Sequence, residues 1–511
     1  MAALEAKSGI VSVIPDTPVQ LTASGWTDAT GVDPNPQTYE GSVNRIAEGI
    51  LQAGTYWGEG YTGAGVDVAL IDSGVVPVNG LTWPGKVING PDLSFESQSD
   101  EFRYMDTYGH GTHMASIIAG RDDGADPGDS AFMGVAPGAR IVSVKVADHN
   151  GATDVSQIIA AIDWVVQHRN DNGMNIRVLN LSFGTNSNQS YLLDPLAFAV
   201  EQAWNAGIVV VVAAGNDGNE TALRNPAVDP YVIAVGATNT AATRPRITSV
   251  MSFSNCGTDD RHVDLVVPGE SIAGLVAPGS AAADNHPESV VGGRYILGSG
   301  TSQSAALISG AAALILEKSP EATPDQVKLL LMENSDDRFK KVDPNCAGDG
   351  IPNLEWAYQE VIKFGLPEDV QAFAPATGVG SLEASRGTDH LENAGVVLEG
   401  EQDIFGNLWD GTSWSTAAAQ GTSWSGGDWN GTSWSGTSWS GTSWSGTSWS
   451  GTSWSGTSWS GTSWSDAVWS DKHWSGTSWS GTSWSGTSWS GTFWSGTSWS
   501  GLSWGRSASM L

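Results

Sequence analysis

Short apolar runs that alternate with helical patterns constrain the fold of this chain more than any other feature. Four runs rich in Val, Ile and Leu stand at residues 66–71, 140–146, 177–183 and 208–213. Segments with apolar residues at helical spacing lie among them, at 154–168 and 195–206. Near-continuous apolar strands joined by helices are typical of a parallel sheet covered on both faces. The sequence therefore predicts an α/β fold of three layers, in which helices cover both faces of a mainly parallel sheet.

Polar residues stand where the predicted strands end. Asp72 directly follows one apolar run, Asn216 follows another, and Ser182 lies near the end of a third. The functional groups of such sheets gather at the carboxyl ends of the strands. We therefore expect these three side chains to face one site at that edge.

A serine stands where a glycine-bearing turn becomes a helix. Gly300 and Thr301 precede Ser302, and a buried central helix is predicted at 304–317. Glycine lets the backbone turn tightly, and the start of a helix presents unpaired N–H groups and the positive end of the dipole. This position suits a hydroxyl that must become an alkoxide and an oxyanion that must be held.

A hydroxyl nucleophile needs a base to take its proton, and that base needs a carboxylate to orient it. His110 opens a predicted helix at 110–119 and suits the role of base. Asp72, at the end of a predicted strand, suits the role of the carboxylate. The three residues occur in the chain order Asp, His, Ser.

The motifs around these residues resemble those of the subtilisin-like serine peptidases (peptidase family S8). Asp72–Gly74 matches the family's Asp-Ser/Thr-Gly, His110–His113 its His-Gly-Thr-His, and Gly300–Ser302 its Gly-Thr-Ser. The resemblance covers residues 41–365. It implies a secreted serine endopeptidase with Asp72, His110 and Ser302 as catalytic triad, polypeptides as substrates and no cofactor required for catalysis.

The same resemblance assigns further residues to the site. Asn216 follows Ala-Ala-Gly and matches the asparagine whose amide donates to the oxyanion hole. The segment that pairs with the substrate backbone and lines the specificity pocket corresponds to Leu181, Ser182, Phe183 and Gly184. We expect these residues to contact the substrate.

Four carboxylates gather in a loop with Gly and Pro, at Asp122, Asp123, Asp126 and Asp129. Such clusters bind calcium in other proteins, and calcium is common in the family that this chain resembles. The alternative is a solvated acidic loop. His113 follows His110 by three residues, but no third metal ligand stands at a sensible spacing, so we interpret it as a packing histidine.

Composition excludes some classes of partner and leaves one question open. The formal net charge of −32 argues against nucleic-acid binding, which needs basic surfaces. The sequence contains no run of about 20 apolar residues, so it predicts no membrane span. The two cysteines, Cys256 and Cys346, either form a disulfide in an oxidising compartment or are two unrelated buried thiols.

The ends of the peptidase-like region suggest further divisions. Residues 1–22 resemble the end of an inhibitory propeptide, and we expect a signal peptide and the rest of the propeptide upstream; the alternative is a plain N-terminal arm. This interpretation implies a secreted or cell-surface protein whose own propeptide is one of its partners. Residues 23–40 are expected to be a processing loop, and residues 366–408 a linker.

Residues 409–511 repeat the unit Gly-Thr-Ser-Trp-Ser and hold nineteen of the chain's 25 tryptophans. A period of five matches neither a strand nor a helix. One interpretation is a solenoid in which coils of four pentads stack their tryptophans in ladders. The other is a flexible chain with tryptophans as adhesive points. Because exposed indole rings stack on sugars, attachment to a cell wall or polysaccharide is a further expectation.

Two classes of function therefore remain. The first is a serine endopeptidase whose tail anchors it or restrains its site. The second is a non-enzymatic surface or matrix protein in which the peptidase fold is a silent scaffold for the tail. The complete set of three triad residues favours the first.

Overall fold

The computed structural model describes residues 25–424 apart from 36–37, 100, 127–130, 241–248, 337–343, 369, 394–395 and 405–406, together with strand segments between residues 428 and 504. The expected propeptide remnant, 1–22, lies outside the described residues. The expected processing loop, 23–40, contributes strand β1 (Gly25–Trp26), which pairs antiparallel with β11 (Tyr295–Ser299).

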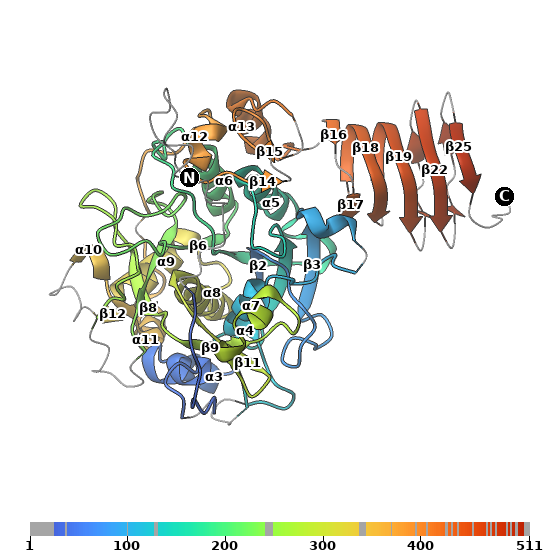
Figure 1. Cartoon of the computed structure of the whole chain (residues 1–511). Helices are drawn as coiled ribbons and strands as arrows, with labels where there is room; N and C mark the ends of the chain where they lie inside the picture. The colour runs from blue at the N-terminus through green and yellow to red at the C-terminus, as the bar shows by residue number, and fades with distance from the viewer. Residues whose placement is uncertain are drawn as a thin grey trace, which may run out of the picture.

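Seven strands form the central sheet in the order β3, β4, β2, β5, β6, β7, β8 (Figure 1). Every pairing between these strands is parallel. The strands are β2 (Asp67–Asp72), β3 (Val87–Asp92), β4 (Arg140–Lys145), β5 (Ile176–Leu181), β6 (Val209–Ala213), β7 (Ile233–Thr238) and β8 (Leu265–Pro268). All residues of β2, β6, β7 and β8 are buried, which agrees with a sheet covered on both faces. The predicted parallel sheet is confirmed, while β3, β7 and β8 lie outside the four predicted runs.

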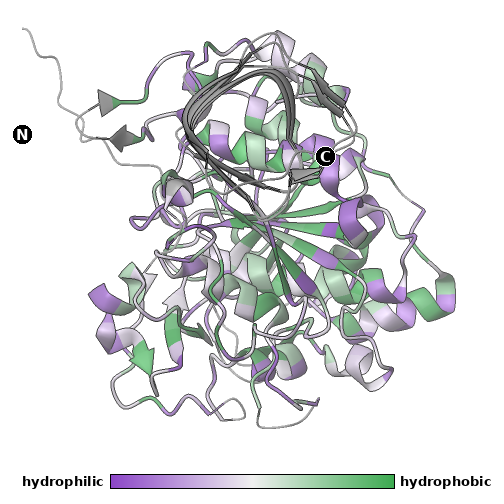
Figure 2. Ribbon diagram, turned by 90° about the vertical axis from the view of Figure 1, so that its right-hand side faces the viewer, coloured by the Kyte–Doolittle hydropathy of each residue, from purple (hydrophilic) through white to green (hydrophobic). Residues whose placement is uncertain are grey.

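Helices cover the sheet in two pairs. Helix α4 (His110–Ala119) packs against α8 (Thr301–Lys318), and α5 (Val155–His168) packs against α6 (Pro195–Asn205). Figure 2 shows helices on both sides of the predominantly hydrophobic strands. The predicted three-layer arrangement is therefore confirmed.

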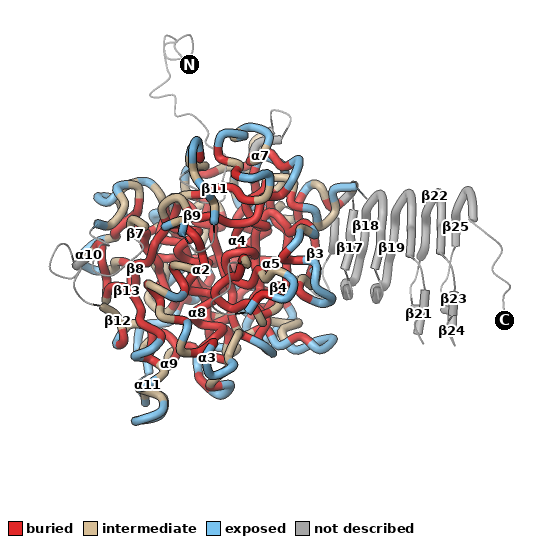
Figure 3. Tube along the Cα trace, turned by 90° about the horizontal axis from the view of Figure 1, so that it is seen from below, coloured by how far each residue is buried: buried red, intermediate tan, exposed pale blue. Residues whose placement is uncertain are grey.

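Helix α8 is the central helix of its layer. Its residues are buried without interruption from Thr301 to Leu316, and it contacts β2, β5, β6, β7 and β8. In Figure 3, α8 and α4 lie within the buried interior. The helix begins at Thr301, three residues before the predicted start, so Ser302 lies inside its first turn.

Smaller elements complete the described fold. A second sheet joins β1, β9, β10 and β11. The remaining elements are α2 (Val43–Arg45), η1 (Ile46–Ile50), α3 (Gly54–Gly58), η2 (Phe95–Gln98), η3 (Asp171–Gly173), β9 (Ile272–Leu275), α7 (Ala281–Asn285), η4 (Pro287–Ser289), β10 (Val290–Val291), α9 (Pro324–Glu333), β12 (Ser335–Asp336), α10 (Pro344–Ala347), β13 (Ile351–Pro352), α11 (Leu354–Phe364), α12 (Leu382–Arg386), β14 (Glu392–Asn393), β15 (Val396–Val397) and α13 (Gly411–Ala419). Among the described helices, none combines the length and the apolarity that crossing a bilayer requires.

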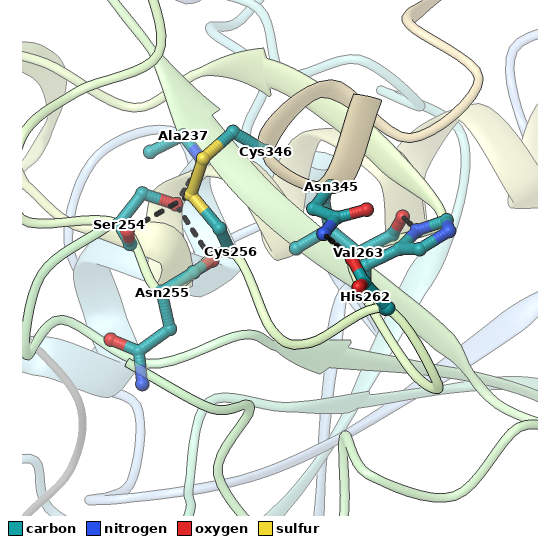
Figure 4. The surroundings of a disulfide bond; sticks show 9 residues. Ala237, Ser254, Asn255, Cys256, His262, Val263, Asn345 and Cys346 are labelled. Carbon is teal, nitrogen blue, oxygen red and sulfur yellow. Dashed lines mark hydrogen bonds between the residues drawn. A yellow bond between two sulfur atoms is a disulfide. The ribbon is translucent and has the colours of Figure 1, made fainter. Parts of the chain in front are cut away.

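Cys256 and Cys346 form a disulfide bond (Figure 4). Both residues are buried, and they are 90 positions apart in the sequence. Closing a loop of that length removes entropy from the unfolded chain, which stabilises the fold by about 4–5 kcal/mol in the chain-entropy model. Of the two alternatives for the cysteines, the structure therefore shows the disulfide, a bond typical of oxidising compartments.

The segment expected to be a linker, 366–408, is folded onto the body. Helix α12 contacts both α5 and α6. Arg386 of α12 is fully buried, and its Nε donates to Asp154 Oδ2 at 2.7 Å. Both side chains are inaccessible to solvent, so each charge depends on the other for compensation. This buried ion pair is the physical reason why the segment differs from a loose connection.

The first residues of the expected tail also pack on the body. Helix α13 contacts α6, and the ring of Trp414 meets Phe198 edge-on at 5.5 Å between centroids. The indole N–H groups of Trp414 and Trp424 both donate to Asp163 Oδ2 on α5, at 3.0 and 2.8 Å. These tryptophans keep the five-residue register of the tail but belong to the packed structure.

Further along the tail, the described strands pair in parallel with tryptophan opposite tryptophan. Trp439 is opposite Trp454, three pentads on, whereas Trp459 is opposite Trp479, four pentads on. Figure 1 shows β18, β19, β22 and β25 side by side in that order. The stacked interpretation of the tail stays a prediction; it expected an offset of four pentads throughout, whereas the described pairings have offsets of three and of four pentads. The strands are β16 (Asp428–Asn430), β17 (Ser433–Gly436), β18 (Trp439–Gly451), β19 (Trp454–Asp466), β20 (Trp469–Ser470), β21 (His473–Ser475), β22 (Ser478–Gly486), β23 (Trp489–Ser490), β24 (Phe493–Ser495) and β25 (Trp499–Trp504).

Replacing Asp163 by Asn tests the contact between α5 and the two tryptophans. Burial raises the pKa of Asp163 to about 6. A carboxyl that keeps its proton to about pH 6 when folded, but only to about pH 4 when unfolded, loses up to about 3 kcal/mol of folding stability as the pH rises through that window. An amide oxygen still accepts both indole protons and carries no charge. We therefore expect Asp163→Asn to match the wild type at pH 4.5 and to exceed its stability at pH 7.5 in thermal unfolding.

The matched control is Asp410→Asn, because Asp410 caps α13 at an exposed position. This control should not remove the pH dependence. An Asp163→Asn variant that is less stable than the wild type at both pH values would show that the indoles need an ionised carboxylate.

Candidate active site

Asp72 and His110 meet at the carboxyl edge of the sheet. Asp72 is the last residue of β2, and His110 is the first residue of α4. Nδ1 of His110 lies 2.9 Å from Asp72 Oδ1 and 3.0 Å from Oδ2, and both side chains are buried. The backbone N–H of Ser73 donates to Asp72 Oδ1 at 2.8 Å. The backbone of the next residue therefore helps to hold the carboxylate of Asp72 in the orientation in which it contacts the imidazole of His110.

A second carboxylate fixes the start of α4. Asp106 accepts the N–H groups of Gly109 and Thr112 at 2.6 and 2.7 Å and the hydroxyl of Ser73 at 2.7 Å. The hydroxyl oxygen of Ser73 in turn accepts the N–H of Gly111 at 2.9 Å. Although burial raises the pKa of Asp106, these donors act in the opposite direction. Ser73 and Asp106 therefore tie the end of β2 to the start of α4.

The contact with Asp72 determines which nitrogen of His110 can accept a proton. A carboxylate accepts hydrogen bonds, so Nδ1 carries the hydrogen that faces Asp72. Nε2 is then the basic nitrogen of the neutral ring. Among the described residues, none forms a hydrogen bond with Nε2 of His110. The imidazole is oriented as a general base requires.

Ser302 is buried in the first turn of α8, and α8 packs against α4. Gly298 lies close to both helices. A side chain in its place would put its Cβ 3.0 Å from Nε2 of His113 and 2.5 Å from Nε2 of Gln303. His113 follows His110 by one helical turn, and Gln303 follows Ser302 directly. The structure therefore brings His110 and Ser302 to neighbouring helix starts, while Asn216 lies at the same edge.

Asn216 is held by the residue that precedes the serine. The backbone N–H and the hydroxyl of Thr301 both donate to Asn216 Oδ1, at 2.9 and 3.1 Å. Thr301 Oγ1 also lies 3.2 Å from the backbone nitrogen of Gly215. Since Thr301 occupies the amide oxygen, the orientation of the amide is set and its NH₂ group is presented on the opposite side. Sequence reasoning missed this role of Thr301, although the threonine belongs to the Gly-Thr-Ser motif.

The segment expected to contact substrate, Leu181 to Gly184, continues β5 at the carboxyl edge. All four residues are buried, and Phe183 is among the largest fully buried side chains. The next residue, Thr185, pairs with Asn225 through two backbone hydrogen bonds of 2.9 and 3.1 Å. The segment lies where the expected role requires it, and its contact with substrate stays a prediction.

His113 is a packing residue in this structure. It is fully buried, and its ring meets Trp26 edge-on at 5.4 Å between centroids. Burial lowers the pKa of His113 to about 3, so the ring is neutral. Within the described residues, no group of three His, Cys, Asp or Glu side chains is arranged to hold a metal ion.

The loop expected to bind calcium does not fit that ion in its described part. Both carboxylate oxygens of Asp122 accept hydrogen bonds from Arg294. Asp123 and Asp126 are exposed, and Asp129 lies outside the described residues. A calcium ion at Asp122 would have to displace a guanidinium, whereas calcium sites offer several uncommitted oxygens.

The chain is similar to known proteins over more than half of its length. A family model described as the subtilase family matches residues 63–350. The serine protease AprX of Bacillus subtilis is 37% identical over 308 residues, which cover 58% of this chain and 67% of that protein. A subtilisin of Bacillus pumilus is 33% identical over 281 residues, which cover 54% of this chain and 86% of the relative.

Other relatives are matched over about half of their length. The extracellular serine proteinase of a Thermus strain is 35% identical over 271 residues, which cover 53% of this chain and 55% of that protein. Among solved structures, fervidolysin from Fervidobacterium pennivorans, a keratinolytic enzyme related to subtilisin, has a TM-score of 0.50 and 27% identity; the match covers 68% of this chain and 51% of that one.

The contact between Thr301 and Asn216 can be tested with two variants. Asn216→Ala removes the amide and should lower kcat for peptide hydrolysis by about 10²–10³, a magnitude taken from the same kind of experiment on a subtilisin. Thr301→Val removes one of the two hydrogen bonds that Thr301 donates to that amide and should cost about fivefold to tenfold, the value of one hydrogen bond. Equal losses in both variants would contradict a purely orienting role for Thr301. Circular dichroism checks that both variants fold.

Proposed function

This chain belongs to the subtilase family, and from that premise we propose that it is a serine endopeptidase whose catalytic triad is Asp72, His110 and Ser302. The observation that carries the proposal is the pairing of His110 Nδ1 with Asp72 at 2.9 Å, with Nε2 turned away from the carboxylate. Helix α8, whose first turn bears Ser302, packs against α4, and this packing supports the proposal.

The proposed reaction moves one proton between Ser302 and the leaving group. Ser302 Oγ attacks the peptide carbonyl carbon while its proton passes to His110 Nε2. The resulting imidazolium is stabilised by Asp72. His110 then gives the proton to the leaving amine as the C–N bond breaks, which leaves an acyl group on Ser302. A water molecule, deprotonated by His110, releases the acid product and restores the serine.

The negative oxygen of each tetrahedral intermediate needs donors that are already in place. We assign this role to the side-chain amide of Asn216 and the backbone N–H of Ser302. Two features support the assignment: Thr301 donates to the amide oxygen of Asn216, and Ser302 lies in the first turn of a helix, at the positive end of the helix dipole. Hydrolysis by this route uses residues of the chain alone and requires no cofactor.

Polypeptides are the proposed substrates, and the segment Leu181–Gly184 is proposed to pair with them. We also propose that the protein is secreted or held at the cell surface and that its own propeptide is a partner before processing. The buried disulfide between Cys256 and Cys346 supports this location, because such bonds persist in oxidising compartments.

Labelling with a fluorophosphonate probe tests the catalytic assignment. The probe reacts with an activated serine, so the wild type should be labelled and Ser302→Ala should not. The neighbouring Ser304→Ala variant is the control, since Ser304 donates to the carbonyls of Val267 and Pro268 and should stay unreactive. A folded wild type that takes no label would overturn the proposal and favour the silent scaffold.

We propose a second role for the tail, attachment to a cell wall or polysaccharide. The parallel strands place tryptophan opposite tryptophan over several coils, as at Trp444 and Trp459. Such an array repeats one aromatic group at regular intervals, which suits a repetitive polymer as ligand. This role is compatible with the enzymatic one, because the tail lies outside the stretch that matches the family.

Two truncations separate attachment from stability. Removing residues 425–511 keeps the contacts of Trp414 and Trp424 with Asp163, so peptidase activity and melting temperature should stay unchanged while binding to insoluble peptidoglycan is lost. Removing residues 409–511 also strips Asp163 of both indole donors and should lower the melting temperature. Undiminished binding after the shorter truncation would contradict the attachment role.

A further inference from the structure

A segment beyond the family match reaches the candidate active site. Residues 376–404, which we call the C-terminal strap, lie after the matched stretch 63–350. The strap is anchored at the N-termini of two helices. Arg386 pairs with Asp154, the cap of α5, and the hydroxyl of Ser385 donates to Asp194, the cap of α6, at 3.0 Å. Both helices follow strands of the sheet, so these caps lie at the carboxyl edge.

One carboxylate of the strap contacts two different parts of the site. Asp389 Oδ2 accepts the backbone N–H of Asn186 at 2.8 Å and Nη1 of Arg224 at 2.9 Å. Asn186 lies two residues after Gly184, the end of the segment expected to bind substrate. Burial raises the pKa of Asp389, and these two donors act in the opposite direction. The carboxylate of Asp389 in the strap is therefore contacted both by the chain that follows the expected substrate-binding segment and by Arg224.

The opposite side of the Arg224 guanidinium contacts the loop that carries Asn216. Nε and Nη2 of Arg224 donate to the two oxygens of Asp217, at 2.7 and 2.6 Å. Asp217 directly follows Asn216, and hydrogen bonds from Arg224 hold the pKa of Asp217 below its usual range. A bidentate pair of this kind fixes both distance and orientation.

The aliphatic part of the Arg224 side chain lies against both Gly184 and Gly215. A Cβ added to Gly184 would lie 2.6 Å from Arg224 Cβ, and one added to Gly215 would lie 2.7 Å from Arg224 Cγ. Gly184 ends the expected substrate-binding segment, and Gly215 precedes Asn216. Arg224 therefore packs closely against both segments.

We propose that Asp389 is a positioning residue for peptide hydrolysis: through Arg224 and Asn186 it holds the loop that carries Asn216 against the segment Leu181–Gly184. Within the strap this positioning role belongs to Asp389, while residues such as Arg386 and Ser385 hold the strap on the body. This inference rests on the proposed function, because positioning has meaning only if Asn216 and Ser302 act on a peptide.

The test compares Asp389→Asn with the wild type in the full-length protein. The substituted amide keeps the shape of the side chain and an acceptor for Asn186, but it lacks the charge that attracts Arg224. We expect kcat for a peptide substrate to fall about tenfold, the value of a charge-assisted hydrogen bond. Active-site titration with the fluorophosphonate probe expresses kcat per competent serine, so a loss of folded protein does not mimic the effect.

The matched control is Glu383→Gln, in helix α12 of the same strap. Glu383 pairs with Arg386 and His390 and accepts the N–H of Gly400, so all its partners lie within the strap. This variant changes the charge equally and should lower the melting temperature while kcat stays unchanged. If Asp389→Asn and Glu383→Gln change kcat and melting temperature alike, Asp389 has only a structural role.

A double variant identifies the route. In an Arg224→Gln background, which already lacks the guanidinium, Asp389→Asn should have little further effect on kcat. Effects that multiply independently would overturn the link through Arg224, as would an unchanged kcat in Asp389→Asn. A folded wild type that neither takes the probe nor cleaves peptides overturns the proposed function as well, whereas labelled wild type with an unaffected Asp389→Asn overturns the positioning role alone.

Discussion

The burial of helix α8 from Thr301 to Leu316 is the constraint on which the site depends. Small residues allow the helix to approach its neighbours closely: a Cβ on Gly310 would lie 2.6 Å from Val135 Cβ. A helix packed this tightly against α4 and the sheet cannot slide or rotate without opening voids in the core. Ser302, in its first turn, inherits that rigidity. The proposed nucleophile is thus placed by the core.

Local patterns predicted the parts of the fold that depend on apolar periodicity. Helix α4 begins at His110, as expected, because a glycine turn and an apolar face mark it. The start of α8 was expected three residues too late, since Thr301, Ser302 and Gln303 are polar and yet buried. Such burial is explained by contacts with distant segments, such as the hydrogen bonds between Thr301 and Asn216. A periodicity argument cannot detect partners that lie far apart in the sequence.

The same limit explains the strap and the acidic loop. Arg386 and Asp154 are 232 positions apart, so composition alone made the segment resemble a linker. The carboxylates of Asp106, Asp154 and Asp194 accept N–H groups at helix starts along the carboxyl edge. Asp122, expected to bind calcium, is taken by Arg294. In this chain buried acids mostly hold backbone and cations in place, and their number in the sequence does not reveal which partner each one has.

The two coil lengths of the tail have a consequence for how such a sequence can change. Pairing three pentads apart and pairing four pentads apart both set tryptophan opposite tryptophan. Gain or loss of whole repeats therefore preserves the match between neighbouring coils, while any other insertion sets tryptophan against serine, threonine or glycine. A gene that gains or loses copies of its repeat can lengthen or shorten this tail without a compensating substitution. The length of the tail can therefore change by mutation independently of the peptidase domain.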